Sequence, residues 1–342
     1  MVGGDLNSLQ PYMLARTRDF LNESLALADR LPHFLWASMI LGSYLGRMRR
    51  VEEGFVVISS AARLASACGL TRDPAANIEY DYLLSPPKDG LEIAERVRLA
   101  HSIYITDQVL STLSGLRATY AYDGRGYEIP EEGRRETSIT SPSIMDMKVS
   151  MMNIFERVSD FARFVCANGL AEPEESYDSL KAQVLSVESS IPSFSDPLGL
   201  GPFEAVSTSR PHIFLVHVTV YGSGMVLHSL RASKDPEARR EMLRNLRSLV
   251  DACEEIRGPK RSDVVHAGLP SMRHVMNAIR VLAHELRAPE ARQSSQLSIH
   301  YCETIEVLLD FLDDLTISYP AWADAPVPLA DVIVPAVNAL AV

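Results

Sequence analysis

The sequence has few cysteines and no excess of basic residues. Its 342 residues include four cysteines, and Lys plus Arg number 33 against 44 Asp plus Glu, giving a formal net charge of −11. A protein that binds nucleic acid over its whole surface needs a concentrated positive face, which this balance excludes. The cysteines are too widely spaced for a disulfide framework or a paired-thiolate metal motif. We therefore expect buried free thiols in a reducing, intracellular compartment, at Cys68, Cys166, Cys253 and Cys302.

The N-terminus also lacks the basic opening and the apolar run of a secretory signal. One stretch, 211–230, has no Asp, Glu, Lys or Arg and approaches the length of a membrane-spanning helix. It contains three histidines, two glycines and several hydroxyl side chains, which make it too polar for hydrocarbon. We expect it to form a helix buried inside a bundle, and we expect no membrane contact.

Apolar residues recur at helical spacing along nearly the whole chain, and no strand alternation of useful length appears. The composition, 46% hydrophobic and 23% charged, is typical of a folded globular chain. We predict an all-α fold, a single large irregular multi-helix bundle over 1–342 with two long irregular loops, at about 117–142 and 191–209. The predicted helices cover 9–31, 33–50, 51–68, 91–116, 143–168, 173–190, 211–232, 235–257, 269–287 and 289–318.

Local signals give more detail at the N-terminal end. The helices over 33–50 and 51–68 are joined so tightly that they must form an antiparallel hairpin. Gly69 is expected to end the second of them in a left-handed conformation. Pro32 is expected to close the helix that precedes the hairpin.

The sequence carries no recognisable catalytic signature. The glycine pair in Gly222-Ser223-Gly224 lies inside a helical stretch with no preceding strand, which argues against a dinucleotide site or a nucleophile elbow. No Walker sequence occurs. We predict that the chain is not an enzyme and that it has no cofactor-binding, metal or DNA-binding residues; effector-binding residues are left open.

Nine histidines invite a metal hypothesis. His217 and His228 are eleven residues apart, which places them on one helix face, but His284-Glu285 has no correctly spaced partner for a metal site in a bundle. Buried, hydrogen-bonded histidines are the interpretation that we favour. A helical-bundle enzyme that uses the histidines near 212–228 stays open as an alternative.

Charged residues cluster on faces that we expect to be solvated. Arg240, Arg244 and Arg247 follow helical spacing but alternate with acidic residues, so we expect an exposed helix with ion pairs along it. Acidic positions expected on solvated faces are Glu254, Glu255, Asp310, Asp313 and Asp314.

Three segments carry a family pattern. In the first, an apolar helix is followed by a short basic turn and a second helix. The second helix contains ARLA at 62–65, and GLTRD follows at 69–73. SPPKDGLEIAERVR follows at 85–98, and IYITD at 103–107. Tyr221 and the VLH at 226–228 lie further on. Together these segments resemble the fungal-specific transcription factor domain, the middle homology region of zinc binuclear cluster transcription factors, over a core of about 8–325.

This resemblance implies an all-helical regulatory domain that controls transcription in the nucleus through a small-molecule effector or a transcriptional co-regulator. Members of the family normally carry a basic module with six closely spaced cysteines that contacts DNA, and this chain has none. DNA contact would then be supplied by a module absent from this chain. The alternative is a stand-alone helical scaffold that binds a protein or a metabolite without DNA.

Four residues in the resembling segments have two interpretations. Arg63 and Arg96 are possible effector contacts, but an Arg beside Asp73, Glu95 or Asp107 more often locks helices together. Two aromatic residues, Tyr104 and Tyr221, are expected to be core residues rather than ligand platforms.

Overall fold

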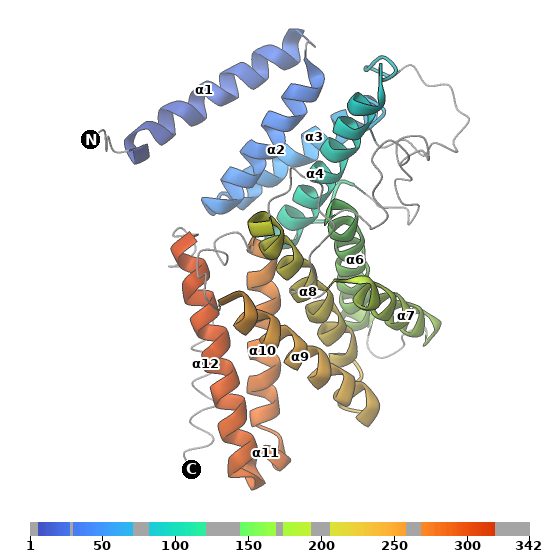
Figure 1. Cartoon of the computed structure of the whole chain (residues 1–342), viewed down its shortest axis with the longest axis vertical. Coiled ribbons are helices and arrows are strands. Elements are labelled where there is room, and N and C mark those ends of the chain that lie inside the picture. Colours follow the sequence, from blue (N-terminus) through green and yellow to red (C-terminus); the bar gives the residue numbers. More distant parts are fainter. Residues whose placement is uncertain are drawn as a thin grey trace. The chain divides into compact units, whose positions relative to one another are not determined.

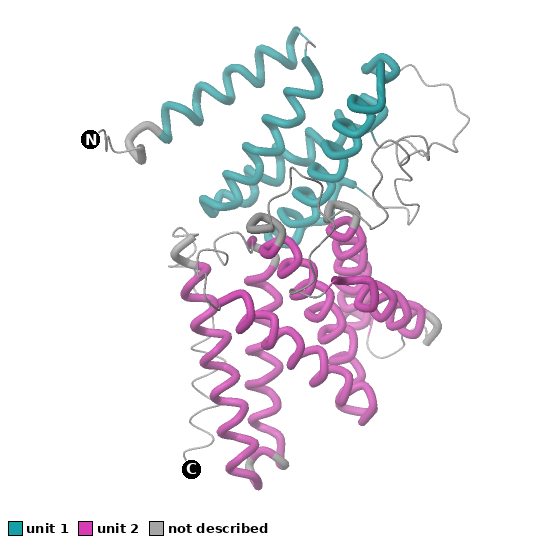
Figure 2. The backbone as a smooth tube through the Cα atoms, in the orientation of Figure 1, with its two compact units in different colours: residues 1–138 teal, residues 139–342 magenta. Residues whose placement is uncertain are grey.

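The computed structural model describes residues 6–27, 30–70, 82–120, 144–168, 174–192, 206–257 and 268–318. All regular structure in these segments is α-helical, which confirms the predicted all-α multi-helix class (Figure 1). Contacts divide the chain into two compact units, Met1–Ser138 and Ile139–Val342 (Figure 2). The single domain over 1–342 stays a prediction.

Unit 1 consists of α1 (Leu6–Leu27), α2 (Leu31–Arg47), α3 (Val51–Ala67) and α4 (Gly90–Ser114). Helices α2 and α3 form the predicted hairpin, α4 packs on both of them, and α1 contacts α2. The expectation that Pro32 closes a helix is wrong, because Pro32 lies in the first turn of α2. A proline fits there since first-turn amides need no acceptor within the helix.

Two glycines allow the hairpin helices to approach closely. A Cβ atom added at Gly54 would lie 2.9 Å from the carbonyl oxygen of Gly42, and one at Gly42 would lie 3.3 Å from the carbonyl oxygen of Gly54. Behind this crossing, Leu35, Ile58 and Ile103 are fully buried. The small residues therefore set the distance at which α2 and α3 close over the core of unit 1.

A helix cap at Gly69 and a buried carboxylate at Asp107 fix the chain after α3 and after α4. Gly69 has φ 76°, as predicted, and Leu70 N–H donates to the carbonyl of Ala65 at 3.0 Å. Asp107 is fully buried on α4, and its Oδ2 accepts the N–H groups of Thr119 and Tyr120 at 2.7 and 2.8 Å. This carboxylate fixes the start of the loop predicted at 117–142, of which 121–142 lies outside the described residues.

Unit 2 is arranged around one helix, α8 (Val206–Ser229). It is contacted by α6 (Ile144–Asn168), α7 (Glu174–Ser190), α9 (Pro236–Arg257) and α10 (Gly268–Leu286), as Figure 1 shows. The uncharged stretch is thus a buried helix, as predicted, with most of its side chains inaccessible to water. No helix in the described part of the chain is long and apolar enough to cross a membrane.

Two predicted boundaries in unit 2 are wrong. The loop expected at 191–209 is shorter, because α8 begins at Val206; residues 193–205 lie outside the described segments. The helix expected over 289–318 is two helices, α11 (Pro289–Gln293) and α12 (Ser295–Ser318). Ser294 is extended between them, and its Oγ accepts the N–H of Leu297 at 3.3 Å, so it caps α12.

The crossing of α2 and α3 can be tested by adding bulk at its centre. We expect Gly54→Val to destabilise unit 1 by about 2–3 kcal/mol, because the new side chain meets backbone atoms of α2 that have little room to move. Ser60→Ala, at an exposed position of α3, is the control and should change little. Hydrogen exchange over 31–70 measures the effect, and unchanged protection in Gly54→Val would contradict the close packing.

Candidate functional site

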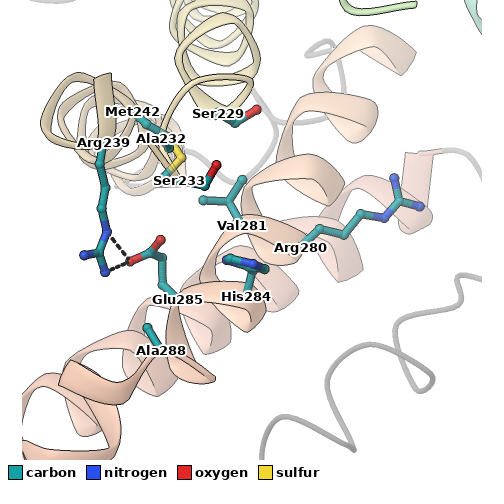
Figure 3. A pocket seen from close by; sticks show the side chains of 10 residues that line it. All are labelled: Ser229, Ala232, Ser233, Arg239, Met242, Arg280, Val281, His284, Glu285 and Ala288. Carbon is teal, nitrogen blue, oxygen red and sulfur yellow. Dashed lines mark hydrogen bonds and ion pairs between the residues drawn. The ribbon is translucent and has the colours of Figure 1, made fainter. Parts of the chain in front are cut away.

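A cavity of about 540 Å³ lies in unit 2 where α8 ends, α9 begins and α10 ends (Figure 3). Its lining comes from all three helix ends and from the turn between α8 and α9. This volume falls within the range of pockets that hold small organic ligands. It is the larger of the two cavities that we describe.

Local sequence signals position the lining. Asp235 and Pro236 start α9, with Asp235 Oδ1 accepting the N–H of Glu237 at 2.8 Å. Before it, the N–H of Arg231 donates to the carbonyl of His228 at 3.1 Å, closing the turn after α8. A turn this tight brings the first turn of α9 close to the end of α8. Helix α10 also packs along α8.

One ion pair crosses the cavity wall from α9 to α10. Arg239 Nη2 and Nε donate to Glu285 Oε2, at 2.6 and 3.2 Å. The Glu285 side chain is only 6% exposed, whereas that of Arg239 is 34% exposed. Both bonds end on the same carboxylate oxygen. The other oxygen, Oε1, accepts no hydrogen bond from the described residues, and in Figure 3 it lies on the side of the carboxylate facing Ser233.

The rest of the lining combines apolar and polar groups. Met242 and Val281 belong to the apolar wall, with Ala232 and Ala288, and Met242 is buried. Ser229 Oγ donates to the carbonyl of Val226 at 2.7 Å, so its lone pairs remain to accept. Arg280 donates to Asn277 at 3.2 Å, and its guanidinium extends away from Glu285 in Figure 3.

A nucleophile needs a base within hydrogen-bond reach, and the cavity shows no such pair. Among the residues that line it, neither Ser229 nor Ser233 is hydrogen-bonded to His284. The arrangement suits reversible binding of a small molecule that has a polar head and an apolar body.

His217 and His228 on α8 are buried and hydrogen-bonded, as predicted, whereas His284 and His300 are exposed, so the prediction is wrong for them. His228 Nδ1 is 2.7 Å from the hydroxyl of Tyr177, and His217 Nε2 is 3.0 Å from the carbonyl of Pro192. Burial lowers the pKa of His217 and lowers that of His228 to about 4. In the described segments, no group of three or more His, Cys, Asp or Glu side chains is placed to hold a metal ion.

Another buried histidine, His274, was not singled out in the sequence. His274 on α10 is fully buried, edge-on to Phe155 at 5.0 Å between centroids, and neither ring nitrogen has a hydrogen-bond partner among the described residues. A Cβ atom at Gly222 would lie 2.1 Å from its Nδ1. Gly222 is therefore needed for helix packing, and burial lowers the pKa of His274 to about 3.

The residues singled out in unit 1 do not line this cavity, which is formed by residues of unit 2. Arg96 donates to Glu92 at 2.6 Å, an ion pair within α4, and with Trp36 it lines a second cavity of about 470 Å³ between α2 and α4. Arg63 is exposed on α3. Tyr104 is a core residue as predicted, edge-on to Tyr120.

Tyr221 is only half-buried, so the prediction of a core residue is wrong for it. Its hydroxyl is 3.2 Å from Nδ1 of His217 on the same helix, α8. Arg72 and Asp73 lie outside the described residues.

Several charged and thiol side chains differ from expectation. The predicted solvated face of α12 is partly wrong: Asp314 is buried and accepts from Arg257 at 3.0 Å. Arg244 reaches Glu188 on α7 at 3.0 Å as well as its neighbour Glu241, so ion pairs here also join helices.

Cys68 and Cys253 are buried as expected, but Cys166 is exposed and Cys302 is half-exposed. Cys166 follows Val165, the last buried residue of α6, and the next position on a helix turns away from the core.

Comparisons with protein-family models, with curated proteins and with solved structures return no match for this chain.

The buried histidines predict a specific pH dependence. His228 and His274 have lower pKa values in the folded chain than in the unfolded one, so between about pH 6.5 and 4 the unfolded chain binds more protons. Their contribution to stability is complete above about pH 6.5 and falls as the pH drops, by about 1.4 kcal/mol per unit for each histidine.

This dependence is measured by urea unfolding at pH 7, 6, 5 and 4.5. His274→Leu and, separately, His228→Gln should each reduce the slope of unfolding free energy against pH by about one proton. Equal slopes in both variants and the wild type would contradict the burial of these neutral rings.

The contribution of the Arg239–Glu285 ion pair to stability can be tested by substituting two neighbouring arginines separately. Arg239→Met keeps much of the side-chain volume but leaves Glu285 buried without its partner, and we expect a loss of about 2 kcal/mol. Arg240→Met changes an exposed arginine on the same helix and should cost little. Chemical denaturation compares the two variants, and equal stabilities would show that the pair contributes nothing.

Proposed function

We propose that this chain is the regulatory domain of a fungal transcription factor, acting in the nucleus without enzymatic activity. In this proposal a small-molecule effector binds between α8, α9 and α10, and a DNA-binding module outside the chain contacts DNA. The observation that carries the effector role is the cavity lined by the Arg239–Glu285 pair, in which no serine is paired with a base. The transcriptional role rests on the resemblance of the segments that form α2, α3 and α4.

The cavity suggests how binding is transmitted. Its lining comes from three helix ends, so a ligand that contacts all three stabilises one arrangement of them over others. A ligand shifts a conformational equilibrium only by its difference in affinity for the two states. The Arg239–Glu285 pair joins α9 to α10 and is the contact most directly exposed to such a ligand.

The alternative function is a stand-alone helical scaffold that binds a metabolite or a protein without DNA. It uses the same cavity, and the net charge of −11 agrees with it equally well. The two functions differ in whether effector binding changes transcription when a DNA-binding module is supplied.

A thermal-stability screen with metabolites tests the effector role. A ligand at about 100 times its Kd stabilises the folded state by about 2.7 kcal/mol, which raises the melting temperature by roughly 5 °C. Val281→Phe fills the cavity from α10 and should abolish the shift. Ile299→Phe makes a similar change at an exposed position of α12 and should leave the shift intact.

The same variants test the transcriptional role. The chain is fused to a heterologous DNA-binding module, and a reporter is read with and without the stabilising compound. We expect the compound to change reporter output in the wild type and Ile299→Phe, but not in Val281→Phe. A compound that stabilises the chain through the cavity without changing the reporter would favour the stand-alone scaffold.

A further inference from the structure

The side chain of Glu285 indicates what kind of ligand head the cavity takes. The carboxylate is nine-tenths buried, and Arg239 engages only its Oε2. Oε1 receives no donor from the described residues, although a carboxylate oxygen has two lone pairs to offer. Oε1 lies on the cavity side of the carboxylate, so a ligand group that donates N–H or O–H can bind it there.

The charge of the lining decides between a neutral donor and a cation. Arg239 already neutralises Glu285, and the other arginine of the lining, Arg280, adds a positive charge further from this carboxylate. An ammonium head would be held near a lining with a net positive charge. An uncharged hydroxyl or amide N–H forms the same hydrogen bond to Oε1 without that repulsion.

The apolar wall indicates the rest of the ligand. Met242 and Val281, with Ala232 and Ala288, line the cavity beside the carboxylate. Short alanine side chains leave space, and a methionine adapts its shape to what fills that space. A compact branched aliphatic group matches this wall better than an extended chain or a highly hydroxylated compound.

We infer that the cavity binds an uncharged small molecule that donates a hydrogen bond to Glu285 Oε1 and places a branched aliphatic group against Met242 and Val281. The inference rests on the proposed function, because it names the class of the effector that would occupy that site.

The requirement for an N–H donor on the ligand can be tested with amides that differ only in their number of N–H groups. We expect 4-methylpentanamide to bind the full chain in a ligand-observed NMR titration, and its N-methyl derivative, which keeps one N–H, to bind similarly. The N,N-dimethyl derivative has the same carbonyl and aliphatic group but no donor and should bind at least fivefold more weakly. So should 4-methylpentylamine, a cation. Equal affinities of the amide and the dimethylamide would overturn the inference.

A substitution at Glu285 tests the acceptor itself. Glu285→Gln has one side-chain oxygen, which Arg239 engages, so an NH₂ group replaces Oε1 as the group open to the ligand. We expect this variant to lose the fivefold preference for the amide or to reverse it. Glu306→Gln, at an exposed position of α12, should keep the preference. A preference that survives in Glu285→Gln would overturn the inference, as would one lost in Glu306→Gln.

Val281→Phe separates this inference from the proposed function and needs no change at Glu285. If the amide binds to the wild type and not to Val281→Phe, the cavity is the site and the inference stands. If a basic or dianionic metabolite stabilises the chain through the cavity while the amide does not bind, the inference fails and the proposed function stands. If no compound depends on the cavity, both fail.

Discussion

The burial of α8 is the constraint on which unit 2 depends. With no charged side chain over 211–230, this helix is covered on nearly all sides, and α6, α7, α9 and α10 supply the cover. Two glycines of α8 determine how closely α9 and α10 pack against it. Gly222 leaves room for the ring of His274, and Gly224 leaves room for Asn245, whose Oδ1 would lie 2.6 Å from an added Cβ atom. These contacts fix α10 and α9 against the central helix.

The cavity follows from where the central helix ends. Helix α8 stops at Ser229, and the cavity lies between this end, the start of α9 and the end of α10. An ion pair between α9 and α10 lines it. A buried pair of this kind is weak evidence for stability, because the desolvation of both charges offsets their attraction. The Oε1 atom of its carboxylate faces the cavity, as the proposed binding of a ligand requires. This is why we connect function with this end of the bundle and not with the charged faces of α9 and α12.

Features that depend on local sequence were predictable, and those that depend on distant contacts were not. The buried helix, the α2–α3 hairpin and the cap at Gly69 each follow from composition or spacing within a few residues. Arg239 and Glu285 are 46 positions apart, so no spacing rule connects them. The sequence placed His284-Glu285 in a metal hypothesis because both can be ligands, whereas the structure gives Glu285 an arginine partner. The break at Ser294 was missed because residues 289–296 are nearly all polar and give no apolar spacing from which to place it. Only the serine, a good helix N-cap, indicated a new start.

Hydrogen exchange of the full chain, with and without a stabilising compound from the thermal screen, tests the central claim most directly. Local opening free energies rise where a ligand binds, so the peptides that gain protection locate the site. We expect increased protection at the end of α8, the start of α9 and the last turns of α10, over about 226–242 and 280–288. Protection confined to α2 and α4 around Trp36 and Arg96, or spread evenly over unit 2, would contradict it.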